Sequence, residues 1–93
     1  MHREVKRIEC RVLGLVQGVF YRAYVSERAA ARGIVGKAEN LREGSVLVVA
    51  EGPEDELRFF AEELSRGPRG AKVESVSVSW QEAAGEYNDF SIQ

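Results

Sequence analysis

Hydrophobic and polar residues alternate near the start of the chain. Between residues 6 and 13 one face carries Ile8, Cys10 and Val12, and the other carries charged side chains. A period of two predicts a β-strand with one buried side. Cys10 lies on the apolar face, so we expect a core residue rather than a reactive thiol.

A period near four predicts two helices. In residues 22–33 the first helix is rich in alanine, with Tyr21, Val25 and Ala29 spaced by four, and Gly33 provides a stop. In residues 52–68 Pro53 suits the first helical position and is followed by three acidic residues. The buried stripe of this second helix is expected to contain Leu57, Phe60, Ala61 and Leu64.

Four more segments have strand character. Residues 34–41 and 45–51 flank a turn at Gly44 and predict a hairpin, and both faces of residues 45–51 are apolar, as in a central strand. Residues 71–80 and 87–93 also alternate. The order β-α-β-β-α-β, with a short final β, predicts an α+β fold: a ferredoxin-like split β-α-β sandwich over residues 1–93. We expect an antiparallel sheet with strands one and three central and both helices on one face.

Composition and charge limit the partners of the protein. Hydrophobic residues make up 44% and charged residues 30% of the 93 residues, and the net charge is -2. This balance is typical of a globular domain and gives no general attraction to nucleic acid. One cysteine allows no internal disulfide, and no apolar run reaches the roughly 20 residues of a membrane span. We therefore expect a cytoplasmic monomer that binds neither nucleic acid nor membrane.

Familiar catalytic devices are missing from the sequence. His2 is the only histidine and lies near the N-terminus, so a histidine-dependent nucleophile is not expected. The sequence lacks a zinc-type ligand set and both the Walker and the G-x-G-x-x-G motifs. The acidic run at residues 54–56 is best explained by the dipole of the helix that it begins. An enzyme with this sequence is expected to work without metal or cofactor.

The stretch GLVQGVFYRAY, residues 14–24, joins the first strand to the first helix. Gly14 and Gly18 free the backbone, and the helix start leaves N–H groups without partners, so together they form a candidate anion nest. Arg22 opposes the helix dipole unless its guanidinium turns back onto a bound anion. An ordinary tight turn followed by an exposed arginine remains an alternative.

Asn40 lies at the end of a predicted strand, directly before the hairpin turn. Asparagine is a common turn former. Its amide also carries an acceptor and a donor that could hold a water molecule. The residues alone leave both interpretations open.

The two blocks together resemble the acylphosphatase family. GLVQGVFYRAY is similar to the signature loop of that family, and GIVGKAENLREGSVLVVAEGPEDEL is similar to its second block. The resemblance extends through GPRGAKVESVSVSW to the closing FSI. It implies a ferredoxin-like fold and hydrolysis of acyl phosphates to a carboxylate and inorganic phosphate.

The resemblance also assigns site residues. It implies that Arg22 binds phosphate and that Asn40 orients the attacking water. It implies that the backbone N–H groups of one loop cradle the phosphate: Leu15, Val16, Gln17, Gly18, Val19, Phe20 and Tyr21.

Four positions depart from common family residues: Leu15, Tyr21, Lys37 and Leu47. None removes the arginine or the asparagine, so we expect activity to be kept. Leu15 and Lys37 could alter substrate preference or charge near the site.

Two rival functions share the predicted fold. A non-catalytic module could bind phosphate without turnover, because fold does not fix function. An RNA-binding domain of the RRM type would present aromatic residues on strands one and three. Those strands here, KRIECRVL and SVLVVAE, contain no aromatic residue, which disfavours RNA binding.

Overall fold

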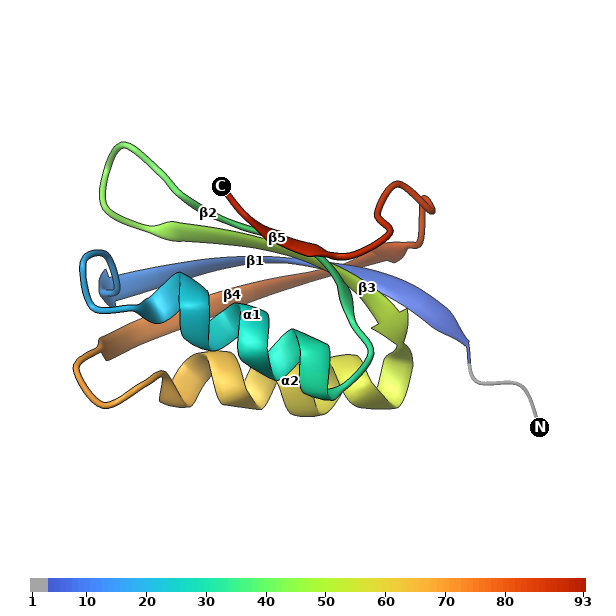
Figure 1. Cartoon of the computed structure of the whole chain (residues 1–93), viewed down its shortest axis with the longest axis horizontal. Coiled ribbons are helices and arrows are strands. Elements are labelled where there is room, and N and C mark those ends of the chain that lie inside the picture. Colours follow the sequence, from blue (N-terminus) through green and yellow to red (C-terminus); the bar gives the residue numbers. More distant parts are fainter. Residues whose placement is uncertain (1–3) are drawn as a thin grey trace.

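The computed structural model describes residues 4–93, so His2 lies outside the described part. Figure 1 shows two helices packed beneath a twisted sheet. The elements are β1 (Val5–Leu15), α1 (Tyr21–Ala31), β2 (Val35–Asn40), β3 (Val46–Pro53), α2 (Glu54–Arg66), β4 (Lys72–Glu82) and β5 (Phe90–Ile92). The predicted order is confirmed. Pro53 is the N-cap of α2 and the last residue of β3, so the prediction that it takes the first helical position is wrong by one residue.

The strand order is β4-β1-β3-β2-β5, which confirms the ferredoxin-like α+β fold with β1 and β3 inside the sheet. Neighbouring strands are antiparallel except for β2 and β5, which are parallel, so the expectation of a wholly antiparallel sheet fails at this pair. The cause is the short connection over residues 83–89. It starts β5 at the end of the sheet where β4 stops, so β5 runs opposite to β4 and in the same direction as β2.

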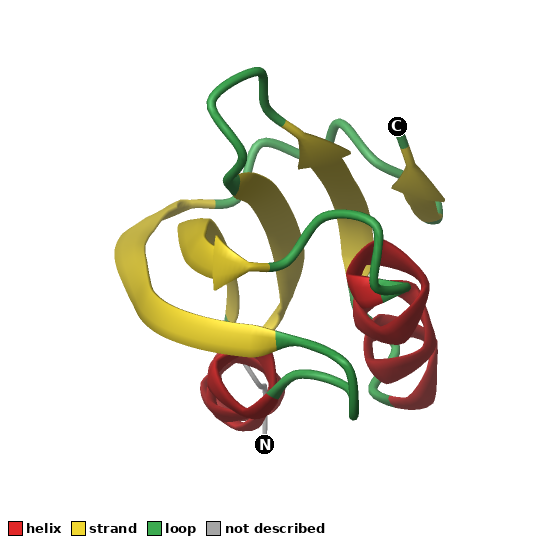
Figure 2. Ribbon diagram, turned by 90° about the vertical axis from the view of Figure 1, so that its left-hand side faces the viewer, coloured by secondary structure: helices red, strands yellow, loops and turns green. Residues whose placement is uncertain are grey.

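The core lies between one face of the sheet and the two helices, as the end-on view in Figure 2 shows. The predicted buried faces are confirmed at Cys10 on β1, Val25 on α1 and Phe60 on α2, which are all fully buried. Ala61, expected in the buried stripe of α2, is only partly buried. Val78 and Trp80 of β4 remain 39% and 42% exposed, because β4 is an edge strand that the helices only partly cover. Within residues 4–93 no helix is long and apolar enough to cross a membrane.

The opposite face of the sheet carries a buried ion pair. The carboxylate of Glu51, only 4% exposed, accepts a hydrogen bond from Arg7 Nε at 2.9 Å. It also accepts the backbone N–H groups of Ala84 and Gly85 at 2.9 and 3.0 Å. Burial alone would raise the pKa of Glu51, but these hydrogen bonds and the nearby Arg7 charge lower it by more, so the net shift is downward. This contact fastens the segment that leads into β5.

Candidate active site

The site lies at the end of the sheet where β1 leads into α1. The end of β2 lies close to it, because β1 and β2 run in the same direction on either side of β3. In Figure 2 this end faces the viewer, with the connecting loops in green around it. The topology therefore brings residues 16–23 and Asn40 together, although they are far apart in sequence.

Two glycines shape the approach to α1. Gly14 has φ 132° at a bulge in β1, and a Cβ there would lie 2.1 Å from the Lys72 carbonyl oxygen, so only glycine fits. Gly18 has φ 74° and open space around it, so its backbone conformation, rather than crowding, calls for glycine. The predicted backbone freedom of both glycines is confirmed.

The N-terminus of α1 lacks the usual neutralising groups. Its N-cap is Phe20, with φ 60° and ψ 24°, whose side chain cannot cap the helix. The first turn of α1, which the structure describes in full, contains no acidic side chain, whereas α2 begins with three. The N–H groups and positive dipole end of α1 are thus left available to an anion.

The side chain of Gln17 joins the two halves of the site. Its Nε2 donates hydrogen bonds to the carbonyl oxygens of Leu41 at 2.7 Å and Ser45 at 2.9 Å. Leu41 and Ser45 flank the β2–β3 turn, and Leu41 directly follows Asn40. The amide of Gln17 therefore ties the loop before α1 to the hairpin that carries Asn40. The resemblance had implied a role only for the backbone N–H of Gln17, not for its side chain.

Tyr21 fixes the start of α1 against α2. It is fully buried, and its hydroxyl donates to the Leu64 carbonyl oxygen at 2.7 Å. Burial raises the pKa of this hydroxyl, so it stays a neutral donor. The contact gives a structural role to the hydroxyl of Tyr21, one of the four positions that depart from the resemblance. It also anchors the residue next to Arg22.

A pocket of about 290 Å³ opens between these segments. It is lined by Val16, Gly18, Phe20, Tyr21, Arg22, Ala23, Asn40 and Ile92. Arg22 Nη1 donates to the Gln93 main-chain oxygen at 2.5 Å. This contact uses one of the five N–H donors of the guanidinium.

Asn40 contributes an unsatisfied acceptor. Its Oδ1 is buried and has no hydrogen-bond partner within residues 4–93. A buried acceptor without a donor is costly, so such an atom is expected to serve a ligand or a water molecule. This favours the site interpretation of Asn40 over that of a turn former.

The structure divides the predicted site residues into two groups. Val16, Gly18, Phe20, Tyr21, Arg22 and Asn40 line the pocket, whereas Leu15, Gln17 and Val19 do not. Leu15 pairs with Lys72 as the last residue of β1, and it is 54% exposed. Val19 packs against the core. Ala23 and Ile92 also line the pocket and were not predicted from the sequence. Ala23 could have been predicted because it directly follows Arg22 in the sequence, but no sequence signal indicated Ile92.

The other departures from the family pattern lie away from the pocket. Lys37 is on β2, where its Nζ forms an ion pair with Glu39 at 3.1 Å. Leu47 is on β3 opposite Arg11 and Glu39. Neither residue lines the pocket. Their effect on turnover is therefore expected to be small.

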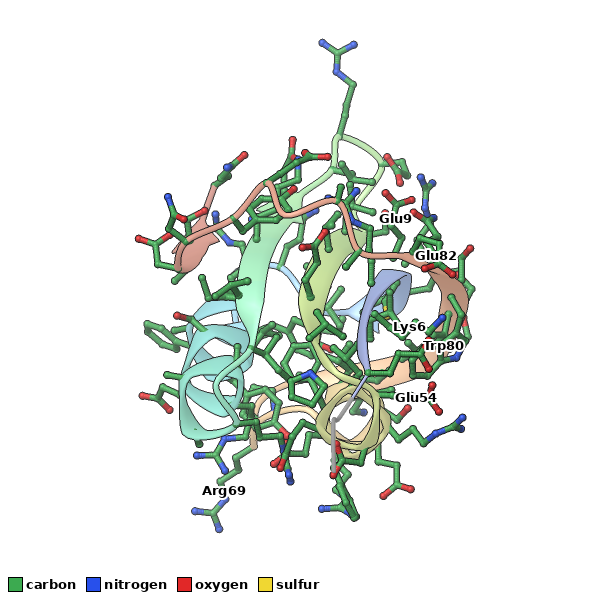
Figure 3. The ribbon with its side chains drawn as sticks, turned by 90° about the vertical axis from the view of Figure 1, so that its right-hand side faces the viewer. Lys6, Glu9, Glu54, Arg69, Trp80 and Glu82 are labelled. Atoms are coloured by element: carbon green, nitrogen blue, oxygen red, sulfur yellow. The ribbon has the colours of Figure 1, made fainter. Side chains whose placement is uncertain are left out.

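A second, larger hollow of about 460 Å³ lies at the opposite end of the sheet. Figure 3 shows Lys6, Glu54, Trp80 and Glu82 around it, between β1, α2 and β4. Lys6 Nζ pairs with Glu82 at 3.1 Å, and the guanidinium of Arg58 lies 5.1 Å from the Trp80 ring centroid. The charged side chains of this hollow thus contact neighbouring side chains of the protein. The smaller pocket at α1 is the better candidate site.

The fold and the pocket define a class of protein: a ferredoxin-like domain with a pocket at the N-terminus of its first helix. The family model for acylphosphatase matches residues 8–92. An acylphosphatase of Thermus thermophilus is 51% identical over 79 residues, covering 85% of this chain and 90% of that protein. An acylphosphatase of Salinibacter ruber is 40% identical over 88 residues, covering 95% and 93%.

A solved structure gives the same result. The crystal structure of acylphosphatase from Bacillus subtilis superposes with a TM-score of 0.91 at 34% identity, covering 95% of this chain and 98% of that one. The chain belongs to the acylphosphatase family. It is a hydrolase of the type that acts on acid anhydrides, and the function of its family is hydrolysis of acyl phosphates.

Proposed function

We propose that the pocket beside α1 is where this chain hydrolyses acyl phosphates, by direct attack of a positioned water on phosphorus. The backbone N–H groups between Leu15 and Tyr21 and the guanidinium of Arg22 hold the phosphoryl group. The absence of acidic side chains from the first turn of α1 supports this assignment. Four donors of Arg22 remain after its contact with Gln93, enough for a forked contact to phosphate oxygens.

The substrate explains why so few functional groups suffice. The leaving group is a carboxylate, whose conjugate acid has a pKa near 4, so it departs without a general acid. Phosphoryl transfer depends mainly on positioning and on stabilising the charge of the equatorial oxygens. Preorganised N–H donors and an arginine supply that stabilisation. A site without histidine is therefore chemically sufficient.

Asn40 positions the nucleophile in this proposal. The single observation that carries it is the buried Oδ1 without a partner, beside a pocket that Arg22 also lines. A water molecule that donates to Oδ1 would be held on the hairpin that carries Asn40. Because an amide is a poor base at neutral pH, the proton of the water passes to a phosphate oxygen.

Turnover of benzoyl phosphate, followed by ultraviolet absorbance, tests the proposal. The wild-type protein should hydrolyse it and be inhibited competitively by inorganic phosphate. Arg22→Ala should lose rate and phosphate affinity together, because one group serves both. A folded wild-type protein that binds phosphate without turnover would favour the non-catalytic module instead. Normal phosphate inhibition in Arg22→Ala would remove Arg22 from the cradle.

A further inference from the structure

Phe20 has a left-handed backbone conformation, which a phenylalanine side chain does not favour. It is the one non-glycine residue with positive φ among residues 4–93. Left-handed backbone is unfavourable for a residue with a Cβ, and glycine or asparagine adopts it more readily. Phenylalanine at this position therefore needs a reason other than the turn.

Burial does not supply that reason. Phe20 is 85% exposed, the highest value among the large hydrophobic residues that the structure describes. An exposed aromatic ring in a strained backbone contributes little to the core. The remaining role is contact with something outside the chain.

The ring lies at the pocket rather than on open surface. Phe20 and Ile92, which is 48% exposed on β5, both line the pocket that contains Arg22 and Asn40. Val16 and Ala23 add further apolar surface, and Arg22 is the one charged side chain among the described lining residues. The pocket thus combines a small polar part with an apolar remainder.

A substrate with one charged end and one apolar end would match this pocket. We infer that Phe20 and Ile92 bind the acyl part of the substrate and select acyl phosphates whose acyl group is aromatic or branched and apolar. This inference rests on the proposed function, because the phosphoryl group must occupy the polar part. An acetyl group is too small to cover both side chains, whereas a benzoyl ring can contact an aromatic ring and an aliphatic chain together.

The test compares kcat/KM for benzoyl phosphate and acetyl phosphate. Phe20→Asn keeps a residue that tolerates left-handed backbone but removes the apolar ring, and Phe20→Leu keeps an apolar side chain. We expect Phe20→Asn to lower kcat/KM for benzoyl phosphate about tenfold and for acetyl phosphate less than about twofold. Phe20→Leu should retain most of the preference, and Ile92→Ala should lose part of it. Phe59→Ala, an exposed phenylalanine on α2 outside the pocket, is the matched control and should keep the wild-type ratio.

Inhibition by inorganic phosphate separates recognition from a structural role. Phosphate has no acyl group and would meet only the backbone N–H of Phe20, which the substitution keeps, so its inhibition constant should be the same in Phe20→Asn and wild type. An unchanged preference in Phe20→Asn, equal losses for both substrates, or weakened phosphate inhibition would each overturn the inference. Wild-type protein that hydrolyses neither substrate would instead contradict the proposed function.

Discussion

Replacing Gln17 tests whether the site works as two coupled halves. The loop before α1 holds the proposed phosphate ligands, and the β2–β3 hairpin holds Asn40. Gln17 Nε2 connects them through the carbonyl oxygens of Leu41 and Ser45, at 2.7 and 2.9 Å. Gln17→Met keeps the length of the side chain and removes both donors.

The structure sets the size of the effect. Two partly buried amide–carbonyl hydrogen bonds contribute about 1 kcal/mol each, so the free energy of unfolding should fall by about 2 kcal/mol. For a domain of this size, that lowers Tm by roughly 8–16 °C. A displacement near 1 Å between water and phosphorus can cost about 100-fold in rate. We therefore expect kcat to fall between about 10- and 100-fold.

Three measurements check this prediction: kcat for benzoyl phosphate, the inhibition constant of inorganic phosphate, and Tm. Phosphate inhibition should change little, because all of the proposed phosphate ligands stay on one intact segment. Gln81→Met on β4, far from the site, is the control and should leave kcat unchanged. A normal kcat with a lowered Tm would refute the coupling and leave Gln17 a purely structural role. A parallel loss of phosphate affinity would show that Gln17 acts through the cradle itself.

Two further predictions concern groups outside the pocket. The pKa of Glu51 is lowered in the folded protein. Its ion pair with Arg7 therefore stabilises the fold fully above the unfolded-state pKa near 4.3. This stabilisation is lost as the pH falls through the lower pKa of the folded state. Glu51→Gln should therefore cost about 3 kcal/mol at pH 7 and progressively less below pH 4 in urea unfolding; a pH-independent difference would contradict the charge-based account. Burial, with a smaller contribution from Glu9, raises the pKa of the Cys10 thiol to about 12, so a thiol-reactive disulfide reagent at pH 8 should label the protein only in denaturant. Rapid labelling of the native protein would show that Cys10 is accessible.

The sequence predicted most of the fold because periodicity reports on burial along a single element. The alternation around Cys10 and the four-residue spacing of Tyr21, Val25 and Ala29 match the buried faces of β1 and α1. The direction and partner of β5 were not predictable in the same way. A strand of three residues has too little pattern to fix its pairing, and its entry depends on Glu51 binding the N–H groups of a segment more than 30 residues away.

In the candidate site, too, local sequence patterns predicted some residues, and contacts between distant segments determine the others. The resemblance indicated Arg22 and Asn40, because their residue types match local motifs. The contacts of Gln17 and the position of Ile92 depend on segments brought together by the sheet, and no local pattern records them. The strained and exposed state of Phe20 likewise requires backbone angles and exposure, which sequence does not provide.

Comparison of kcat with phosphate affinity in Asn40→Ala tests the central claim most directly. If Asn40 orients the attacking water while the loop and Arg22 hold phosphate, kcat for benzoyl phosphate should fall at least about 100-fold. The inhibition constant of inorganic phosphate should stay within about twofold of the wild-type value, because none of the proposed phosphate ligands has changed. An unchanged kcat, or equal losses of turnover and phosphate binding, would contradict the account.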